Sequence, residues 1–377
     1  MAFTTKIFRK IEEIPSNDWN QIYPRVLEGY QFFKSLDESA MGQFSFYYLL
    51  VYEGSALVGA ATCFLMNYSL DTTLQGPLKN LATTVKKIFP GIFNLKALMC
   101  GQPIGQGRMG VAVGYEQAVV KAVYNCIQQI AQSQKVAILV FKEFGASYSA
   151  ALACLEKEGF YKFESMPNTE KEIHFSSFDE YLMTLSYKTR YDLKRKFKKV
   201  DGQVKIDLEI THDLGDALGE AHGLYMQMVS RHEVGLEVMP EKFFECIAKN
   251  MPDQTLFFLW RMEERLVAFA FCLVSGGHFL DYYLGLDYST AYQYHLYFVR
   301  FRDMLKWCIE HKIKTYEMGS TNYDPKKRLG FRFIPLYIYA KFRNRQLNPF
   351  LKIFCEFIKP ERHDPVLRDM KKKELKR

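Results

Sequence analysis

Apolar residues in the first half of the chain recur with spacings that predict strands and helices in a mixed order. The segment 46–65, FYYLLVYEGSALVGAATCFL, predicts two strands joined by a turn. Residues 115–132 carry apolar side chains three and four positions apart, which predicts a helix, and the apolar run 135–141 predicts a buried strand. A second helix within 149–164 is expected to end at Gly159, with another strand after it.

The second half repeats this order. Two strand pairs are expected within 255–286, a helix over 295–311, a strand at 314–319 and a final strand at 335–342. Each half therefore predicts a hairpin that continues into a βαβ unit. Such a unit gives an α/β fold in which helices cover a mixed, twisted sheet.

At 377 residues the chain is too long for one compact core, which agrees with two domains. We expect the first unit to span 1–175 and the second unit to span 176–345, followed by a basic tail over 346–377. An apolar insertion at about 66–100 interrupts the first unit. Within it, lysines punctuate the apolar residues from 78 to 100, a mixture that suits an interfacial segment, a lid over an acyl chain or a plain covering of the core.

Charge is distributed unevenly between the halves. Residues 1–175 carry 16 Lys and Arg against 15 Asp and Glu, whereas residues 176–377 carry 34 against 27. An anionic partner is therefore expected to contact the second half. Aromatic residues make up 15% of the chain, which fits large apolar pockets or contact with lipid, although a strand-rich core would use them equally well.

The eight cysteines are scattered singly and form no C-x-x-C pair, which is typical of reduced core residues in a cytoplasmic protein. The first residues lack the apolar core of a signal peptide, and no run of 18 apolar residues occurs. We therefore expect a cytoplasmic protein, with peripheral contact to the inner membrane face as an option.

One glycine-rich segment offers a phosphate-binding pattern. In CGQPIGQGRMG, which ends at Gly110, the residues Gln102, Gly105 and Gly107 form Q-x-x-G-x-G, which resembles the pyrophosphate loop of GNAT acyltransferases. The phrase LEKEGFYKFESMP at 155–167 looks like the end of a GNAT unit. Together with the repeated order of elements, these residues make the chain similar to tandem GNAT proteins of the Fem-like and predicted N-acyltransferase types, over roughly residues 10–345.

This resemblance implies that Gln102, Gly105 and Gly107 hold the pyrophosphate of acyl-CoA, which would be a co-substrate and not a bound cofactor. The same glycines also spell a dinucleotide fingerprint, but the predicted helix begins only near Tyr115 and no acid follows at the required distance. The remaining alternative is a glycine-rich turn that shapes the wall of a pocket.

Polar residues follow the strand at 314–319, where ligands of open α/β sheets commonly bind. Ser320 and Asn322 are candidates for substrate binding. The resemblance implies that Lys326, with Arg328 beside it, contacts a phosphate or carbonyl of the acyl donor. A solvated loop stabilised by its own charges is the alternative.

Amide formation needs a base that takes a proton from the attacking amine. His295, at the predicted start of a helix, is the first candidate, and Glu317 is its competitor. Tyr283 is a candidate acid for the leaving thiolate. His232 and Glu233 are expected to line a substrate pocket, by resemblance. His295 could instead be a helix cap, and the histidines show no metal-ligand spacing.

A basic helix is predicted over 181–200, in which an apolar stripe faces away from several Lys and Arg residues, among them Arg190. Its options are an anionic membrane, a CoA phosphate, tRNA or plain solvation. Lysines of the tail would add attraction to anionic lipid.

The sequence as a whole favours an N-acyltransferase that transfers an acyl group from acyl-CoA to an amine. The aromatic content, the insertion and the basic second half point to a lipid-like acceptor such as a sphingoid base or a lipid head group. A Fem-like transferase that uses aminoacyl-tRNA is the rival enzyme. A binding protein that keeps the fold without the chemistry is the rival of another class.

Overall fold

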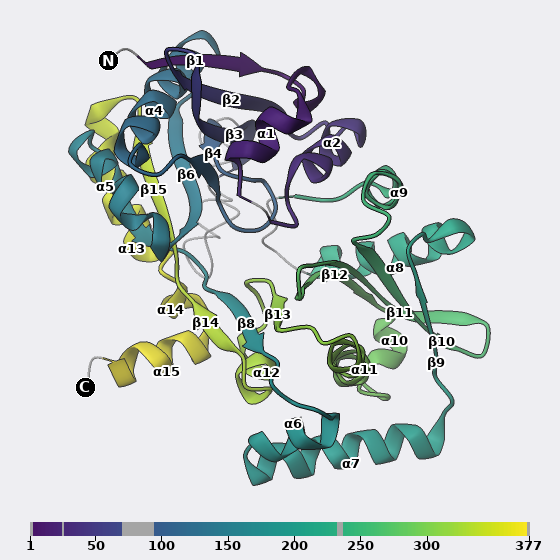
Figure 1. The fold of residues 1–377 in the computed structure, drawn as a ribbon. Helices are drawn as coiled ribbons and strands as arrows, with labels where there is room; N and C mark the ends of the chain where they lie inside the picture. The colour runs from purple at the N-terminus through teal and green to yellow at the C-terminus, as the bar shows by residue number, and fades with distance from the viewer. Residues whose placement is uncertain (1–2, 25, 70–93, 232–236, 375–377) are drawn as a thin grey trace. The chain divides into compact units, whose positions relative to one another are not determined.

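The computed structural model describes residues 3–24, 26–69, 94–231 and 237–374, and the chain divides into two compact units. One unit contains Met1–Pro167 together with Pro335–Arg377, and the other contains Asn168–Ile334. Each unit has its own mixed sheet with helices packed on it (Figure 1). The predicted α/β class with two units is confirmed.

The division between the units differs from the predicted boundaries near residues 175 and 345. The last strand, β15 (Leu336–Phe342), pairs with β6 and β7 of the first sheet. In return β8 (Asn168–Glu172) pairs with β13 and β14 of the second sheet. Hydrophobic alternation shows that these segments are strands, but it does not specify their partners, because pairing is a contact between distant parts of the chain.

The first unit combines helices before and after its sheet strands. Its strands in the described residues are β1 Phe3–Phe8, β2 Ser45–Glu53, β3 Ala56–Ser69, β4 Asn94–Cys100, β5 Met109–Val111, β6 Ile138–Gly145, β7 Tyr161–Glu164 and β15. Its helices are α1 Ser16–Ile22, α2 Tyr30–Glu38, α4 Glu116–Ser133, α5 Ser149–Lys157, α13 Asn348–Phe357, α14 Pro360–His363 and α15 Pro365–Glu374. The main strand order is β1-β2-β3-β4-β6-β15-β7, and β5 pairs with β3.

The second unit has the strand order β14-β8-β13-β12-β11-β10-β9. Its strands are β8, β9 Asp207–Thr211, β10 Thr255–Met262, β11 Arg265–Ser275, β12 His278–Leu286, β13 Thr315–Met318 and β14 Arg332–Ile334. Its helices in the described residues are α6 Phe178–Thr184, α7 Tyr187–Gln203, α8 Leu218–Arg231, α9 Glu241–Asn250, α10 Tyr288–Ala291, α11 Leu296–Glu310 and α12 Tyr323–Arg328.

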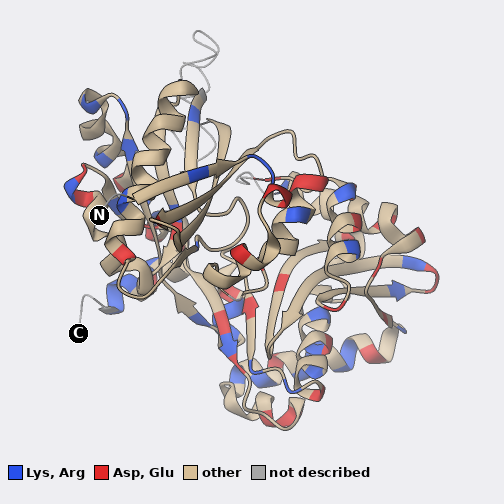
Figure 2. Cartoon of the chain, turned by 45° about the horizontal axis from the view of Figure 1, so that its top comes forward, with Lys and Arg blue, Asp and Glu red and all other residues tan. Residues whose placement is uncertain are grey.

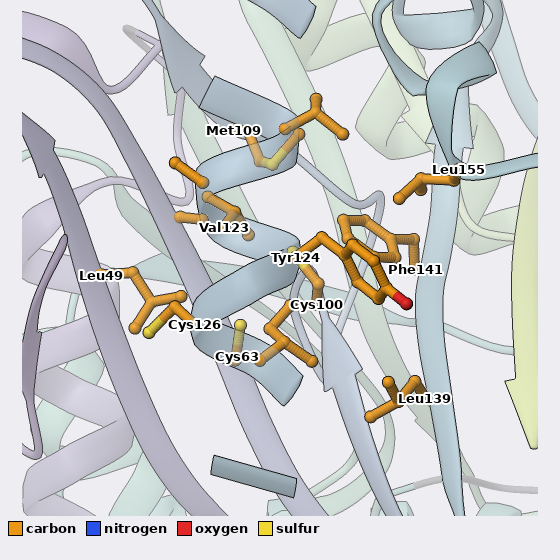
Figure 3. Close-up of a cluster of buried hydrophobic side chains, with 14 of the residues drawn as sticks. Leu49, Cys63, Cys100, Met109, Val123, Tyr124, Cys126, Leu139, Phe141 and Leu155 are labelled. Carbon is orange, nitrogen blue, oxygen red and sulfur yellow. The ribbon is translucent and has the colours of Figure 1, made fainter. Parts of the chain in front are cut away.

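The core of the first unit lies between its sheet and α4. Figure 3 shows Val123 and Cys126 of α4 among side chains that the strands contribute, including Leu49, Cys100 and Phe141. The apolar spacing predicted over 115–132 is therefore the buried face of α4. All eight cysteines of the chain are free thiols, and all except Cys154 are buried.

The sheet of the second unit buries both faces. Residues of α6, α7 and α11 pack on one face, in a cluster that contains Leu193, Phe301 and Tyr316. On the other face, the ring of Phe244 in α9 contacts Phe269 and Phe271 of β11 edge to face. The high aromatic content is therefore used mainly in packing the protein core.

The glycine-rich segment completes the first sheet. β4 runs parallel to β6 only as far as Cys100, and β6 continues to Gly145. Beyond Cys100, the Gly107 amide donates to Glu143 O at 3.0 Å, and Gly107 pairs with Phe144 in a parallel bridge. A Cβ on Gly107 would lie 2.1 Å from Lys142 O, so only glycine lets the loop approach the strand so closely.

We predict that Gly107→Ala lowers the free energy of unfolding by about 1–3 kcal/mol, because the added methyl group collides with a main-chain oxygen that cannot move alone. Gly42→Ala is the matched control, since a Cβ at Gly42 has no neighbour within 4 Å. Urea unfolding followed by circular dichroism measures both. Equal stability of the two variants would show that the loop does not close on β6.

Candidate functional site

The two parallel strand pairs mark equivalent positions in the two units. In the second unit, β12 and β13 pair from His278–Thr315 to Asp281–Met318, after which β13 ends and β12 continues. Diverging parallel strands leave a space at their carboxyl ends, which is where α/β folds place ligands. In the first unit the corresponding space contains the glycine loop.

Several groups of the first unit's glycine loop have partners within the unit. The Gly107 amide is already hydrogen-bonded to Glu143 O. Gln102 is fully buried, and its Nε2 donates to the Tyr23 hydroxyl at 3.4 Å. Gly105 is exposed and its carbonyl accepts from Lys142 Nζ at 3.4 Å. The predicted cradle of Gln102, Gly105 and Gly107 thus packs largely against its own unit.

The helix that follows this loop carries a negative charge at its start. β5 separates the loop from α4, and Glu116, the first residue of α4, accepts the Gly114 amide at 3.1 Å. Hydrogen bonds from its own amide and from Gly114 lower the pKa of Glu116. A carboxylate already occupies the place where a pyrophosphate would meet the helix dipole.

In the second unit, charged side chains are buried at the point where β13 ends. Asp281 of β12 accepts two hydrogen bonds of 2.8 Å from Arg300 Nη1 of α11. The Tyr316 hydroxyl donates to Asp281 Oδ2 at 3.1 Å. Arg300 is 0% exposed, and its Nε and Nη2 atoms have no hydrogen-bond partner in the described structure. A guanidinium buried in this way needs its counter-ion, because an unpaired charge in a low dielectric is strongly unfavourable.

Lys326 adds a second buried cation. It lies in α12, is 4% exposed, and donates from Nζ to Gly319 O at 2.7 Å and to Met318 O at 3.1 Å. Burial lowers the pKa of Lys326 to about 7, with Asp281 opposing the shift and Arg300 adding to it. A group whose pKa lies near the working pH is of the kind that can act as a general base.

A bulge in β12 decides which side chains reach this cluster. The register with β11 shifts between Phe271 and Cys272, so that Tyr283 and Asp281, two residues apart, lie on opposite faces of the sheet. Tyr283 contacts the aromatic residues beneath α8 and α9, and its hydroxyl donates to Glu237 Oε1 at 3.2 Å. Burial and then Glu237 raise the pKa of Tyr283 well above its usual range.

Glu317 also lies on the face away from α11, because its neighbours Tyr316 and Met318 pack toward that helix. It is buried, accepts from Asn168 Nδ2 at 2.5 Å, and lies 3.0 Å from His278 Nε2. His295 is on the other face, directly before α11, with a left-handed backbone (φ 49°). Burial, together with Lys196 and Lys199, lowers the pKa of His295. The three predicted catalytic residues are therefore not assembled into one cluster.

Two predicted binding residues have structural partners. Arg328 Nη2 donates to Asp192 at 2.9 Å, which links α12 to α7. Arg190 Nη1 donates to Leu185 O at 3.3 Å and so caps the end of α6. Both bonds stabilise neighbouring helices, and ligand contacts of these two residues stay a prediction.

Of the remaining predicted residues, Ser320 is half-buried, Asn322 is exposed, and two are undescribed. Ser320 and Asn322 lie between β13 and α12, where Asn322 is exposed and left-handed (φ 56°). His232 and Glu233 lie outside the described residues, as does most of the insertion, from 70 to 93. The sequence analysis missed Asp281, Arg300 and Tyr316. The available signal was a charge inside each of two apolar patterns, HFLDYYLGL and LYFVRFRDML.

The predicted basic helix is two helices and not one. α6 ends at Thr184, and α7 begins after Ser186, whose hydroxyl accepts the Thr189 amide at 3.3 Å. Tyr187 and Tyr191 of α7 are 75% and 62% exposed and stack with ring centroids 6.2 Å apart. The exposed cations of α7 are Lys188, Lys194, Arg195, Lys198 and Lys199. Lys and Arg are marked along the ribbon in Figure 2.

A family described as acting in peptidoglycan biosynthesis/recognition matches residues 10–374, which is nearly the whole chain. The chain belongs to the FemAB-like family. The predicted resemblance to tandem GNAT proteins of the Fem-like type is confirmed.

Solved structures of FemAB-like and tandem GNAT proteins share this fold. The crystal structure of FemX is similar with a TM-score of 0.57 and 12% identity, over 93% of this chain and 99% of that one. A tandem GNAT protein from the clavulanic acid biosynthesis pathway gives 0.54 and 9%, over 90% and 98%. L-PGS from Bacillus licheniformis gives 0.52 and 11%, over 84% and 90%.

A curated relative is similar at the level of sequence. The putative 8-amino-7-oxononanoate synthase 2 of Mycobacterium tuberculosis is 23% identical over 326 residues. That match covers 83% of this chain and 42% of the relative, so the chain spans less than half of the relative's length.

We predict that Asp281→Asn lowers the free energy of unfolding by about 3–5 kcal/mol, because Arg300 would stay buried without its counter-ion. The double variant Asp281→Leu/Arg300→Met removes both charges and should lie much closer to the native stability. Chemical denaturation of the three proteins measures the difference. A double variant as unstable as Asp281→Asn would contradict the importance of the pairing.

Proposed function

We propose that this FemAB-like protein forms amides, transferring an acyl or aminoacyl group from an activated ester or thioester to an amine. The chemistry is assigned to the second unit, where β12 and β13 diverge. The observation that carries the proposal is the buried Lys326 with a pKa of about 7, beside the Asp281–Arg300 pair. A structural lysine on the surface would have no reason for such a shift.

In this proposal neutral Lys326 takes a proton from the attacking ammonium group. The amine nitrogen then bonds to the carbonyl carbon and loses its second proton as the bond from that carbon to the leaving oxygen or sulfur breaks. The leaving group accepts this second proton, and Lys326 returns the first proton to solvent. Arg300, held by Asp281, keeps a positive charge near the carbonyl oxygen as negative charge develops there. Lys326 replaces His295 and Glu317 as the first candidate base, because it lies in the cluster at the diverging strands.

The acceptor that we favour is a lipid-like amine, such as a sphingoid base or a lipid head group. A fold neighbour with a TM-score of 0.52 is named as a putative lysylphosphatidylglycerol synthetase, and the curated relative is named for a compound that carries an amino group beside an oxo group. The family description supports an amine of a peptidoglycan precursor as the alternative acceptor.

Two donors fit the proposal, and the structure offers them different support. The glycine loop, which was the expected site for acyl-CoA, uses its Gly107 amide within the sheet, and Glu116 occupies the following helix start. The exposed lysines and stacked tyrosines of α7 instead match the phosphates and bases of RNA. These observations support aminoacyl-tRNA as a candidate donor beside acyl-CoA.

We predict that Lys326→Met lowers kcat for amide formation by roughly 10²–10⁴-fold. The kcat of the native protein should rise as pH increases through about 7, because only the neutral amine accepts a proton. Purified protein is given acyl-CoA of several lengths or aminoacyl-tRNA, each with a sphingoid base or a peptidoglycan-precursor amine, and mass spectrometry detects the amide.

His295→Ala and Glu317→Gln serve as parallel variants. If Lys326→Met stays active while His295→Ala is inactive, the base is His295. The rise of kcat with pH should then occur at the lowered pKa of the His295 imidazole. If no combination of donor and acceptor gives an amide, the chain is a binding protein on a transferase fold.

The donor is tested separately by binding. We predict that Lys194→Ala/Lys198→Ala weakens tRNA binding and reduces the steepness of its salt dependence by about two charges, without changing protection by acyl-CoA in a thermal shift assay. Lys242→Ala/Lys249→Ala on α9 is the charge-matched control. Unchanged tRNA binding in the α7 variant would remove tRNA as a ligand of this helix.

A further inference from the structure

The helix α13 of the first unit has two apolar faces, of which only one is covered. Leu351 and Cys355 are buried toward the unit's own strands, since α13 packs against β7 and β15. Phe350 and Ile353 are 66% and 57% exposed, and Phe357 follows four residues later, also exposed. Spacings of three and four residues place these three on one side of the helix. Exposed apolar residues in a row usually mark a surface that binds something.

A cationic cavity precedes this helix in the chain. Its volume is about 620 Å³, and Tyr124, Gln128 and Gln132 of α4 line one side. The other side is lined by Lys341 of β15, by Arg343, and by Arg345 of the short 3-10 helix Arg345–Leu347. No Asp or Glu belongs to the lining, which suits a phosphate more than a neutral ligand.

The cations of the cavity have only neutral partners. Lys341 Nζ donates to the Tyr124 hydroxyl at 2.9 Å and to Glu158 O, and Arg343 Nη1 donates to Ala131 O at 3.1 Å. In the described parts of the chain, none of the three cations has a salt bridge. Three positive charges without a carboxylate produce a local potential that attracts anions. A phosphate group, with a charge of about −1.5 to −2 and three acceptor oxygens, would offset it.

The apolar stripe and the cavity belong to one continuous segment. Arg345 and Phe350 are five residues apart, so their Cα atoms are within about 17 Å of each other. Lys352 of α13 adds positive charge, whereas Lys359 is paired with Glu356, and Figure 2 shows further Lys and Arg in the helix near the C-terminus. Apolar side chains with cations around them match the boundary between the acyl chains and head groups of an anionic bilayer.

We propose that residues 341–357 are a docking site for anionic phospholipid, in which the exposed face of α13 enters the membrane interface and the cavity receives a head-group phosphate. A second copy of the chain is a poorer occupant, because it would bring the same positive charges to the contact. This site deepens the proposed function, since it would bring the protein to a lipid-like acceptor. In the described residues no helix is long and apolar enough to cross a bilayer, so the attachment would be peripheral.

The experiment is sedimentation of the full chain with two kinds of vesicle. One contains phosphatidylcholine alone, and the other also contains about 30% phosphatidylglycerol, which gives a strong negative surface potential. We expect binding to the anionic vesicles and little to the neutral ones. Phe350→Ser/Ile353→Ser should weaken binding at least tenfold, and Arg343→Ala/Arg345→Ala by about thirtyfold. In a further arm, inorganic phosphate is added as a competitor. We expect it not to release the protein from the anionic vesicles, because α13 remains inserted in the membrane interface.

Matched controls keep the test specific. Val113→Ser changes an exposed apolar residue just before α4. The 18 residues of α4 extend about 27 Å from there toward the cavity, so this variant should bind vesicles as the native chain does. Lys194→Ala/Lys198→Ala removes two charges from α7 of the second unit. If this variant loses vesicle binding while Arg343→Ala/Arg345→Ala keeps it, α7 is the lipid surface and the proposal is wrong. If Phe350→Ser/Ile353→Ser dissociates a dimer in size-exclusion chromatography and vesicles do not bind, α13 contacts a second copy.

The vesicle experiment measures no transfer, and for that reason it can fail independently of the proposed function. If the native chain does not bind vesicles but forms amides on soluble amines normally, the docking site is wrong and the proposed function stands. Normal vesicle binding without any amide product would leave the docking site valid and reject the transferase.

Discussion

The buried ion pair between Asp281 and Arg300 is a strong constraint on the second unit. Neither charge can be hydrated where it lies, so β12 and α11 must keep the two side chains within hydrogen-bond distance. The bulge in β12 turns Asp281 toward α11, and Tyr316 of β13 adds a third contact. Lys326 is buried in the same unit, and its own burial lowers its pKa, which Asp281 opposes and Arg300 reinforces.

The two units solve one topological problem in different ways. In both, two parallel strands diverge, and the main-chain groups at that point need partners. The first unit supplies a loop, and Gly107 makes the close approach to β6 possible. The second unit supplies side chains, with Thr169 and Lys326 hydrogen-bonded to the carbonyls of Met318 and Gly319. Main-chain closure of the first unit suits stability. The buried charged side chains of the second unit are of a kind that can take part in catalysis.

Sequence reasoning succeeded where the signal was local. The helices within 115–132 and 295–311 and the strands within 46–65 are present, because one turn of helix or one pleat of strand sets the spacing of their apolar residues. It failed for the single helix over 181–200, where the serine cap at Ser186 allowed a break that apolar spacing does not reveal. For the candidate site, the polar loop after a strand pointed to Lys326, whose expected contact with an acyl donor stays a prediction, whereas the Asp281–Arg300 pair was missed.

The sequence by itself determined that this chain forms two α/β units of the tandem GNAT kind, with reduced cysteines and a basic second half. The tertiary structure alone decided that β15 returns to the first sheet, that Gly107 pairs with β6 beyond the end of β4, and that Tyr283 and Asp281 face opposite ways. It also decided which cations are buried and therefore shifted in pKa. The physical reason is range: periodicity is set by neighbouring residues, whereas strand pairing, burial and the electric field at a side chain depend on residues far away in the sequence.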